Sequence, residues 1–454
     1  MLYPSVLSLH IFLAMKKLYA QLFILVLICL PVWKAAAQTH PHCANPDVYK
    51  GTKAAGYSAG SKVFEEWISK VERKEIAKAV QDNDEIYTIP VVVHVLHNGE
   101  AEGTGRNLSN ARVQSQIDIL NNDYSRAVGT PGFNSHASGA DTRIRFCLAT
   151  VDPNGASTNG IVRVNANREG FDFLSDNTLL KGLSIWNPAK YLNVWTCQLN
   201  GNLYIGYAQY PIIPSFWSDS LPMVQPIPDV QPDGVVIDYR VFGDVPPGQS
   251  GPFPSYNKGR TTTHEIGHYL GLLHIWGDGS ACTDNATDYC EDTPPQSTYT
   301  SGCPTGTPGS CIPGVPKMKE NYLDYTNDAC MNIFTKDQKK RMRIVLRNCI
   351  RRNTLLQTPT SCGIADTQPV QPEPEAKLGI RNDIEKQQLI LVAPPDQTIL
   401  KITVFSMSGQ EIPVFPEADA VQSLINLQPL ARGIYNLRVV TSKGQTYLDR
   451  FARW

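Results

Sequence analysis

The 454-residue chain lacks an excess of charge of either sign. Its 41 basic and 42 acidic side chains leave a formal net charge of −1, which excludes the basic surface expected of a nucleic-acid-binding protein and the polybasic patch of a membrane-surface protein. Charged residues make up 18% of the chain and hydrophobic residues 42%. Most of the chain therefore has too many apolar side chains and too few charges to be disordered. No internal repeat is present.

Long hydrophobic runs are also scarce, and the one that exists lies near the amino terminus. Residues 18–32 are apolar, two lysines precede them, and residues 35–37 are all alanine. This order is typical of a secretory signal peptide. We therefore expect residues 1–37 to direct export, with Met15 as the true start. A membrane anchor is the alternative, but the run is shorter than the roughly 20 residues that span a bilayer.

The rest of the chain divides into four parts. Residues 38–85 are polar with Lys/Glu-rich helical stretches, which indicates a pro-segment. Residues 86–362 carry strand and helix patterns and are the candidate catalytic domain. Residues 363–377 are rich in proline and polar residues, as expected of a stiff linker. Residues 378–454 contain short alternating segments separated by turns, which predicts a small all-β module.

Several elements of the central domain can be predicted from local patterns. The β-branched run at residues 89–96 predicts a buried strand, and further strands are expected at residues 144–149, 192–199 and 235–242. Ser109 can cap a helix whose apolar residues fall on one face. Thr335 and Gln338 form a capping box at the start of another helix. A third helix is expected at residues 261–273.

One stretch carries the chemistry: His264, Glu265, His268, Gly271 and His274. On a helix, His264 and His268 lie on one face within reach of one ion. Gly271 lets the chain leave the helix in a left-handed conformation, so that His274 becomes a third ligand. Three neutral nitrogens leave one tetrahedral position open for water, which is the pattern of a catalytic zinc. Glu265 is placed to act as the general base toward that water.

The extended motif resembles the metzincin clan of zinc metallopeptidases. Residues 262–268 (TTHEIGH), 292–294 (DTP) and 321–335 (NYLDYTNDACMNIFT) are similar to the pappalysin family, specifically its cytophagalysin branch. The resemblance covers about residues 86–352. It implies an α+β fold of the zincin type, with a twisted mixed sheet and long helices over an irregular lower subdomain. It also implies a secreted zinc endopeptidase that acts on proteins or peptides.

The resemblance assigns roles to residues after the motif. Tyr325 matches a tyrosine that stabilises the oxyanion of the tetrahedral intermediate. Leu323 occupies the position of the Met-turn methionine beneath the zinc, and it can still supply an apolar floor of similar volume. Met331 is expected to pack elsewhere. Asp328 matches an aspartate at the floor of the S1′ pocket that selects arginine or lysine at P1′; an ordinary turn aspartate is the alternative.

Two other functions remain open on the same scaffold. The departure at Leu323 leaves room for a catalytically impaired surface adhesion or binding protein. Glu265 and the three histidines favour the enzyme, because catalytically dead relatives typically lose the base or a ligand. A hydrolase acting on a substrate other than a peptide is a further alternative, since one fold hosts many functions.

Five cysteines crowd the region directly after the zinc motif: Cys282, Cys290, Cys303, Cys311 and Cys330. The resemblance implies disulfides that staple the loop-rich lower subdomain, with Cys303 paired to Cys330 and Cys282 paired to Cys311. A zinc ribbon is the alternative reading, but paired Cys-x-x-Cys units are missing from the sequence and export places the chain in an oxidising compartment.

Two more sites are hypotheses drawn from relatives. Cys43 in the pro-segment is a candidate latency switch whose thiolate blocks the zinc, although the usual Arg-Cys-Gly context is missing around it. Oxygen donors in the loop after the zinc motif are candidates for a structural calcium site; a solvated acidic loop is an equal alternative. These donors are Asp284, Asp288, Glu291 and Asp292.

The C-terminal module resembles the type IX secretion sorting domain of Bacteroidetes. Residues 404–410 (VFSMSGQ) and 430–439 (LARGIYNLRV) carry this resemblance, which covers residues 378–454. It implies that type IX secretion machinery exports the protein through the periplasm and outer membrane of a Gram-negative bacterium, to the cell surface or the medium. A generic surface-binding β-sandwich is the alternative.

Overall fold

The structure is a computed structural model, and it describes 43–45, 59–77, 85–213, 232–277, 281–283, 287–306, 308–357, 362, 378–383, 387–393, 397–406, 410–414, 417–418, 422–442 and 446–453. The predicted signal peptide, the predicted linker and Asp284 lie outside the described residues. Within the described part of the chain, no helix is long and apolar enough to cross a membrane.

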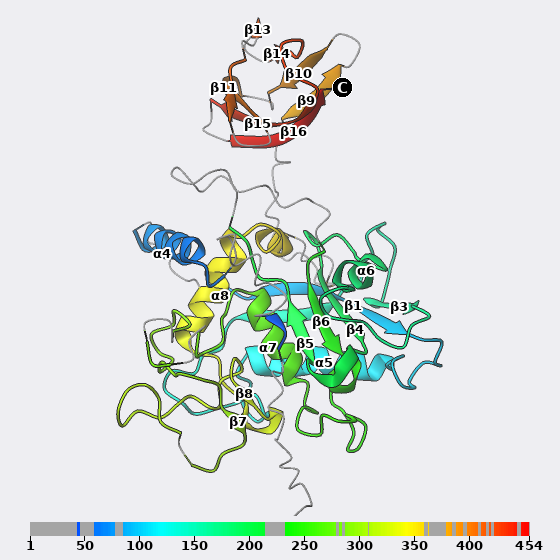
Figure 1. Cartoon of the computed structure of the whole chain (residues 1–454), viewed down its shortest axis with the longest axis vertical. Helices are drawn as coiled ribbons and strands as arrows, with labels where there is room; N and C mark the ends of the chain where they lie inside the picture. Colours follow the sequence, from blue (N-terminus) through cyan, green and yellow to red (C-terminus); the bar gives the residue numbers. More distant parts are fainter. Residues whose placement is uncertain are drawn as a thin grey trace, which may run out of the picture. The chain divides into compact units, whose positions relative to one another are not determined.

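A mixed six-stranded sheet forms the centre of the catalytic region (Figure 1). Its central strand β1 (Tyr87–His97) is buried along most of its length, because its sequence is almost continuously apolar. Consecutive segments of β1 pair in parallel with β2 (Ile144–Leu148) and β3 (Ile161–Asn165). The sheet continues through β4 (Leu192–Cys197) and β6 (Val235–Asp238) to the antiparallel strand β5 (Gly206–Ala208).

The predicted strands are confirmed with differences in length of one to four residues. The strand expected at residues 235–242 ends at Asp238, whose side chain accepts a hydrogen bond from the Arg240 amide and caps the 3₁₀ turn η2 (Tyr239–Val241). Strands β3 and β5 are absent from the sequence prediction. The side chains of β3 are only partly buried, and β5 is three residues long, so neither has a clear hydrophobic pattern.

Two helices pack against each other and against the sheet. Helix α5 (Asn110–Tyr124) is capped by Ser109 and buries the apolar face that the sequence predicts. Helix α7 (Arg260–Tyr269) contacts β5, β6 and α5 (Figure 1). It ends before the predicted residue 273, because Gly271 takes the expected left-handed conformation with φ of 92°.

The lower part of the catalytic region is irregular. It contains the short strands β7 (Ser301–Gly302) and β8 (Tyr325–Thr326), and the turn η3 (Asp328–Cys330). Helix α8 (Lys336–Asn348) follows, with both hydrogen bonds of the predicted capping box, and leads to η4 (Asn353–Gln357). Outside this part lie α6 (Asn177–Gly182) and η1 (Asn200–Asn202).

The predicted disulfides Cys282–Cys311 and Cys303–Cys330 are both formed. A third disulfide, Cys147–Cys362, joins β2 to a residue 215 positions later in the sequence. Four cysteines of the described chain are reduced and buried: Cys43, Cys197, Cys290 and Cys349. The irregular subdomain is therefore held by covalent links as well as by a core.

Part of the predicted pro-segment is helical. Helix α4 (Lys62–Ala77) packs against α8 (Figure 1). Before it, residues 43–45 lie beside strand β5, where the Ala44 amide donates to the Gly206 carbonyl at 3.0 Å.

The C-terminal region is an all-β module, as predicted. Two four-stranded sheets, ordered β13-β14-β10-β9 and β12-β11-β15-β16, contribute side chains to one core. The strands are β9 (Gly379–Asp383), β10 (Gln388–Val392), β11 (Ile399–Ser406), β12 (Glu411–Ile412), β13 (Glu417–Ala418), β14 (Gln422–Asn426), β15 (Gly433–Thr441) and β16 (Thr446–Arg453).

Candidate metal centre and substrate pocket

Helix α7 and the turn that follows it bring three buried histidines together. The Nε2 atoms of His264 and His268 lie 3.0 Å apart, and that of His274 lies 3.2 Å from the first and 3.1 Å from the second. A tetrahedral zinc ion with Zn–N bonds of about 2.0–2.1 Å holds its nitrogens about 3.3 Å apart. The spacing therefore fits a zinc ion.

The protonation of two of the rings also favours a cation at this point. His264 Nδ1 lies 2.7 Å from the Tyr322 carbonyl and His268 Nδ1 lies 2.9 Å from the Leu272 carbonyl. A carbonyl only accepts, so each Nδ1 carries the proton and each Nε2 presents a lone pair. Burial lowers the pKa of His268 to about 4, which keeps its ring neutral. Converging lone pairs repel one another unless a cation lies between them.

Polar side chains of α5 fix the position of α7. Gln116 Oε1 accepts from the Thr262 hydroxyl at 2.8 Å, and its Nε2 donates to the Gly259 carbonyl at 3.1 Å. Asp123 accepts from the Thr263 hydroxyl at 2.8 Å and from Arg260 at 3.2 Å. The sequence analysis missed both residues; the available signal was a polar side chain on the apolar face of an amphipathic helix.

An aromatic wall supports the third ligand. The Trp276 indole stacks on the His274 ring with centroids 4.3 Å apart and planes 5° apart. Tyr325 packs against His274 in a T-shaped contact, with ring centroids 5.0 Å apart and ring planes at 79°. Trp276 was not identified as a site residue from the sequence, although it follows the third histidine by only two positions. Stacking holds the imidazole in one orientation, which a loop ligand otherwise lacks.

Leu323 occupies the floor beneath the zinc helix. Its side chain is fully buried in the main core, and its methyl groups lie closest to the position that a Cβ on Gly267 would take, at 3.2 Å. Leucine therefore fills the Met-turn position as an apolar floor. Met331, expected to pack elsewhere than under the zinc, lines the pocket together with His264 and Asp328.

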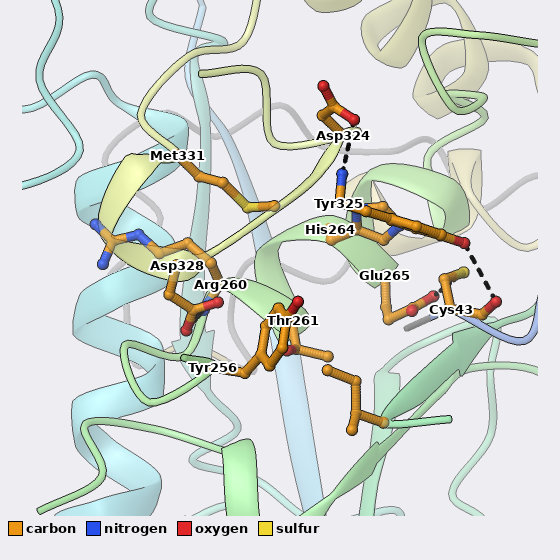
Figure 2. Close-up of a pocket in the computed structure, with 11 residues that line it drawn as sticks. Cys43, Tyr256, Arg260, Thr261, His264, Glu265, Asp324, Tyr325, Asp328 and Met331 are labelled. Carbon is orange, nitrogen blue, oxygen red and sulfur yellow. Dashed lines mark hydrogen bonds between the residues drawn. The ribbon is translucent and has the colours of Figure 1, made fainter. Parts of the chain in front are cut away.

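Glu265 points into the pocket next to the histidines (Figure 2). Its Oε2 accepts from the Cys43 thiol at 3.5 Å, and its buried Oε1 has no hydrogen-bond partner among the described residues. Burial raises the pKa of Glu265 well above its ordinary value. A bound cation opposes this shift, because it favours the ionised carboxylate.

Gly206 leaves the space that Glu265 occupies. A Cβ at Gly206 would lie 2.9 Å from Glu265 Cγ and 3.1 Å from its Oε1.

We expect Gly206→Ala to displace the carboxylate of Glu265 and to lower kcat by about 10–100-fold, because misplacing a catalytic group by about 1 Å costs that much. KM and zinc content should change little. Steady-state kinetics and metal analysis check this. The control is Gly182→Ala, where nothing lies within 4 Å of the new Cβ; a kcat within twofold of wild type for Gly206→Ala would contradict it.

Cys43 lies over the open side of the three histidines. Its Sγ and the histidine nitrogens all lie within 4.8 Å of one another, and all four residues are buried. Burial, together with Glu265, raises the pKa of the Cys43 thiol; a bound zinc ion would instead deprotonate it, because a coordinating thiol ionises outright. The Tyr325 hydroxyl donates to the Cys43 carbonyl at 3.3 Å (Figure 2). The structure thus brings Cys43 together with every residue predicted at the metal centre.

Asp328 lies at the end of the pocket away from Cys43 (Figure 2). Its Oδ2 accepts from the backbone amides of Lys258 at 2.7 Å and Arg260 at 3.2 Å. Its Oδ1 is buried without a partner among the described residues. Burial raises the pKa of Asp328 to about 6. Tyr256 and Met331 also line this pocket, and neither was predicted to do so.

The candidate calcium ligands are less organised. Asp288 Oδ1 accepts from the Thr293 hydroxyl at 2.6 Å and from the Cys290 amide at 3.1 Å. Asp292 Oδ2 accepts from the Asp337 amide at 3.1 Å, and Glu291 is exposed. In the described part of the chain, only Cys43 and the three histidines form a group of metal-ligating atoms.

Comparisons with known proteins agree with this geometry. The model of the family described as pregnancy-associated plasma protein-A, a peptidase M43 family, matches residues 253–347. An extracellular metalloprotease of Arthroderma otae is 30% identical over 256 residues, which cover 56% of this chain and 76% of that relative.

Solved structures give the same result. Mature mirolysin of Tannerella forsythia, in complex with a cleaved peptide, is 40% identical with a TM-score of 0.50; the match covers 60% of this chain and 96% of that one. A promirolysin mutant from the same organism is 34% identical with a TM-score of 0.54, covering 70% and 97%. The chain therefore belongs to the pregnancy-associated plasma protein-A family of metallopeptidases, peptidase family M43.

Proposed function

We propose that the chain is a secreted zinc endopeptidase, made as a latent zymogen, that cleaves on the amino side of arginine or lysine. The observation that carries the proposal is the convergence of three histidine Nε2 atoms, 3.0–3.2 Å apart, beside a carboxylate outside this group of metal-ligating atoms. Zinc analysis and a peptide-library digest of the activated protein test it. Absence of zinc, or no cleavage of any peptide by the zinc-loaded protein, would contradict it.

Each catalytic group has a defined task in peptide hydrolysis. His264, His268 and His274 would hold a zinc ion, which when bound would supply a Lewis acid and lower the pKa of water. Glu265 takes a proton from the attacking water and returns it to the leaving amine. Tyr325 donates a hydrogen bond from its hydroxyl to the oxyanion of the tetrahedral intermediate. The position of Tyr325 between His274 and Cys43 supports this role.

Specificity follows from an unpaired carboxylate oxygen at the end of the pocket away from Cys43. Asp328 Oδ1 has no partner, whereas the neighbouring Arg260 guanidinium is paired with Asp123. A guanidinium or ammonium group at P1′ would satisfy Oδ1 through a charge-assisted hydrogen bond. An apolar side chain would leave the carboxylate buried and unpaired. Asp328 is thus assigned to the S1′ floor rather than to an ordinary turn.

This assignment gives the preference for basic residues a pH dependence. Asp328 has a pKa of about 6, so it is ionised above this pH and protonated below it. We expect the ratio of kcat/KM for P1′ Arg over P1′ Leu to be constant above about pH 7 and to fall roughly tenfold per unit below pH 6. Using the ratio for matched peptides cancels the titration of the catalytic groups. A ratio that stays constant from pH 5 to 8 would refute the assignment.

Latency is assigned to Cys43. Its thiolate would fill the fourth zinc position. The carbonyl of the same residue accepts a hydrogen bond from the Tyr325 hydroxyl, which is then not available to a substrate. The larger share of this chain matched by promirolysin, 70% against 60% for the mature form, supports a pro-segment before the proposed domain of residues 86–362.

The alternative of a catalytically impaired adhesion protein receives no support from Leu323. The leucine packs fully buried under α7, as a Met-turn methionine would. A structural calcium ion is retained as a proposal for Asp288, whose Oδ2 is buried without a partner among the described residues. An unchanged melting temperature after treatment with a calcium chelator would remove that proposal.

The C-terminal module is proposed to be a type IX sorting signal. Deleting residues 378–454 is expected to leave the kcat/KM of the activated enzyme unchanged and to retain the protein in the periplasm of its Gram-negative host. Cell fractionation and immunoblotting measure this, with full-length Glu265→Gln as an inactive control that should still be exported. Normal amounts of the truncated protein in the medium would rule out a sorting role.

A further inference from the structure

We propose that helix α4 is a second anchor of the pro-segment, which binds α8 independently of Cys43. This anchor keeps the pro-segment attached to the enzyme after the chain between the pro-segment and the catalytic domain has been cut. The inference rests on the proposed zymogen function and adds a regulatory step to it. Activation would then require two events, hydrolysis of the chain and dissociation of α4.

The first support is a shared apolar core. Phe64, Trp67, Ile68 and Val71 of α4 are each no more than 8% exposed. They form one buried cluster with residues of the catalytic region, separate from the main core. The residues that the catalytic region contributes to this cluster are Tyr210, Ile213, Leu273, Ile344, Val345 and Cys349. Removal of α4 would expose this apolar surface to water.

The second support is a buried ion pair. Glu65 of α4 accepts two hydrogen bonds from the Arg341 guanidinium of α8, both at 2.7 Å. The two side chains are only 8% and 5% exposed. A bidentate pair in a desolvated setting is specific as well as strong, and removing one partner leaves the other charge buried.

The end of the helix is held as well. The Glu75 carboxylate accepts hydrogen bonds from the Arg347 guanidinium at 2.6 Å and 3.1 Å, and from the side-chain amide of Asn348 at 3.0 Å. Glu72 pairs with Lys340. The carboxylates of α4 therefore pair with the cations of α8 over successive turns, so the charges of the two helix surfaces are complementary.

These contacts are distinct from those of Cys43. Residues 43–45 meet strand β5, Glu265 and Tyr325, whereas α4 meets α8 and the cluster beneath it. Loss of the thiol from the metal centre therefore leaves the ion pairs between α4 and α8 intact, so the two anchors can be released separately.

The α4 site also borders the metal centre. Arg341 Nε donates to the Gly271 carbonyl at 2.7 Å, in the turn that presents His274. The Tyr210 ring of the same cluster lies edge-on to His268, with centroids 5.4 Å apart. Retention of α4 would therefore hold the ligand-bearing turn in its zymogen arrangement, and activity is expected to rise as α4 dissociates.

The test uses the full chain after processing, separated by size-exclusion chromatography and identified by intact mass. The wild-type pro-segment fragment is expected to co-elute with the enzyme, and specific activity to rise on dilution. Glu65→Ala should release the fragment and weaken its binding by at least about 30-fold. The matched control is Glu66→Ala, one residue away but 58% exposed, which should retain it. Cys43→Ala should also retain the fragment, because it leaves the ion pair of Glu65 with Arg341 unchanged.

A second measurement avoids any folding defect of the Glu65 variant. A synthetic peptide of residues 59–77 is added to processed wild-type enzyme, and binding is followed through the fluorescence of its single Trp67. The peptide with Glu65→Ala serves as comparison. The proposal is overturned if the wild-type fragment separates at once, or if the two peptides bind equally or not at all. Chromatography after cleavage by an added protease gives the same readout even if the chain has no peptidase activity.

Discussion

Glu265→Gln is expected to lower kcat by up to about 10⁴-fold, the usual contribution of a general base, without loss of zinc. The amide keeps the size of the side chain but cannot take a proton from water. Because Glu265 is adjacent to the ligands and is not one of them, the three histidines stay in place, as do the carbonyls that accept from Nδ1 of His264 and His268. Turnover of a peptide substrate and the zinc content of the purified variant measure the two parts of this expectation.

The matched control for this variant is Glu102→Gln, which makes the same change at an exposed residue and should retain full activity. Thermal unfolding of both variants tests whether the fold is intact. A Glu265→Gln enzyme that turns over at the wild-type rate would show that another group is the base. Loss of zinc from it would show that Glu265 helps to hold the ion.

Asp328→Ala is expected to weaken kcat/KM for P1′ Arg or Lys by about 2–5 kcal/mol, while peptides with P1′ Leu change little. The reason is that Asp328 Oδ1 is an acceptor without a partner among the described residues, whereas Oδ2 is held by two backbone amides. A peptide library that compares P1′ residues at a fixed sequence gives the ratio directly.

Asp328→Asn separates charge from structure in this experiment. It is nearly isosteric, so the surrounding loop should be preserved, yet it cannot form the ion pair. We expect it to lose most of the preference for basic residues, whereas Asp244→Ala, at an exposed position, should keep it. An unchanged cleavage profile for both Asp328 variants would assign S1′ selectivity to other residues.

Features that depend on local spacing could be predicted from the sequence. The zinc motif needs only a helical turn and a glycine, and Gly271 has the expected positive φ. The caps at Ser109 and Thr335 are likewise formed within a few residues. The two disulfides that follow the motif close loops of under 30 residues, and resemblance to relatives was enough to pair them.

Features that depend on packing between distant segments could not. The hydrogen bonds of Gln116 and Asp123 to α7 span more than 130 residues, and no periodicity reports such a partner. The need for glycine at position 206 exists only because Glu265 folds against it. For the same reason the sequence could present Cys43 only as a candidate, since its position over the histidines depends on its pairing with β5.

The disulfide between Cys147 and Cys362 determines how tension would travel through the molecule. A pull on the chain beyond Cys362, as during secretion or surface attachment, would reach strand β2 through a covalent bond. Because β2 is paired along its length with β1, the load would enter the central sheet. The disulfide would therefore divide the load between the central sheet and the chain that leads back to η4 and α8.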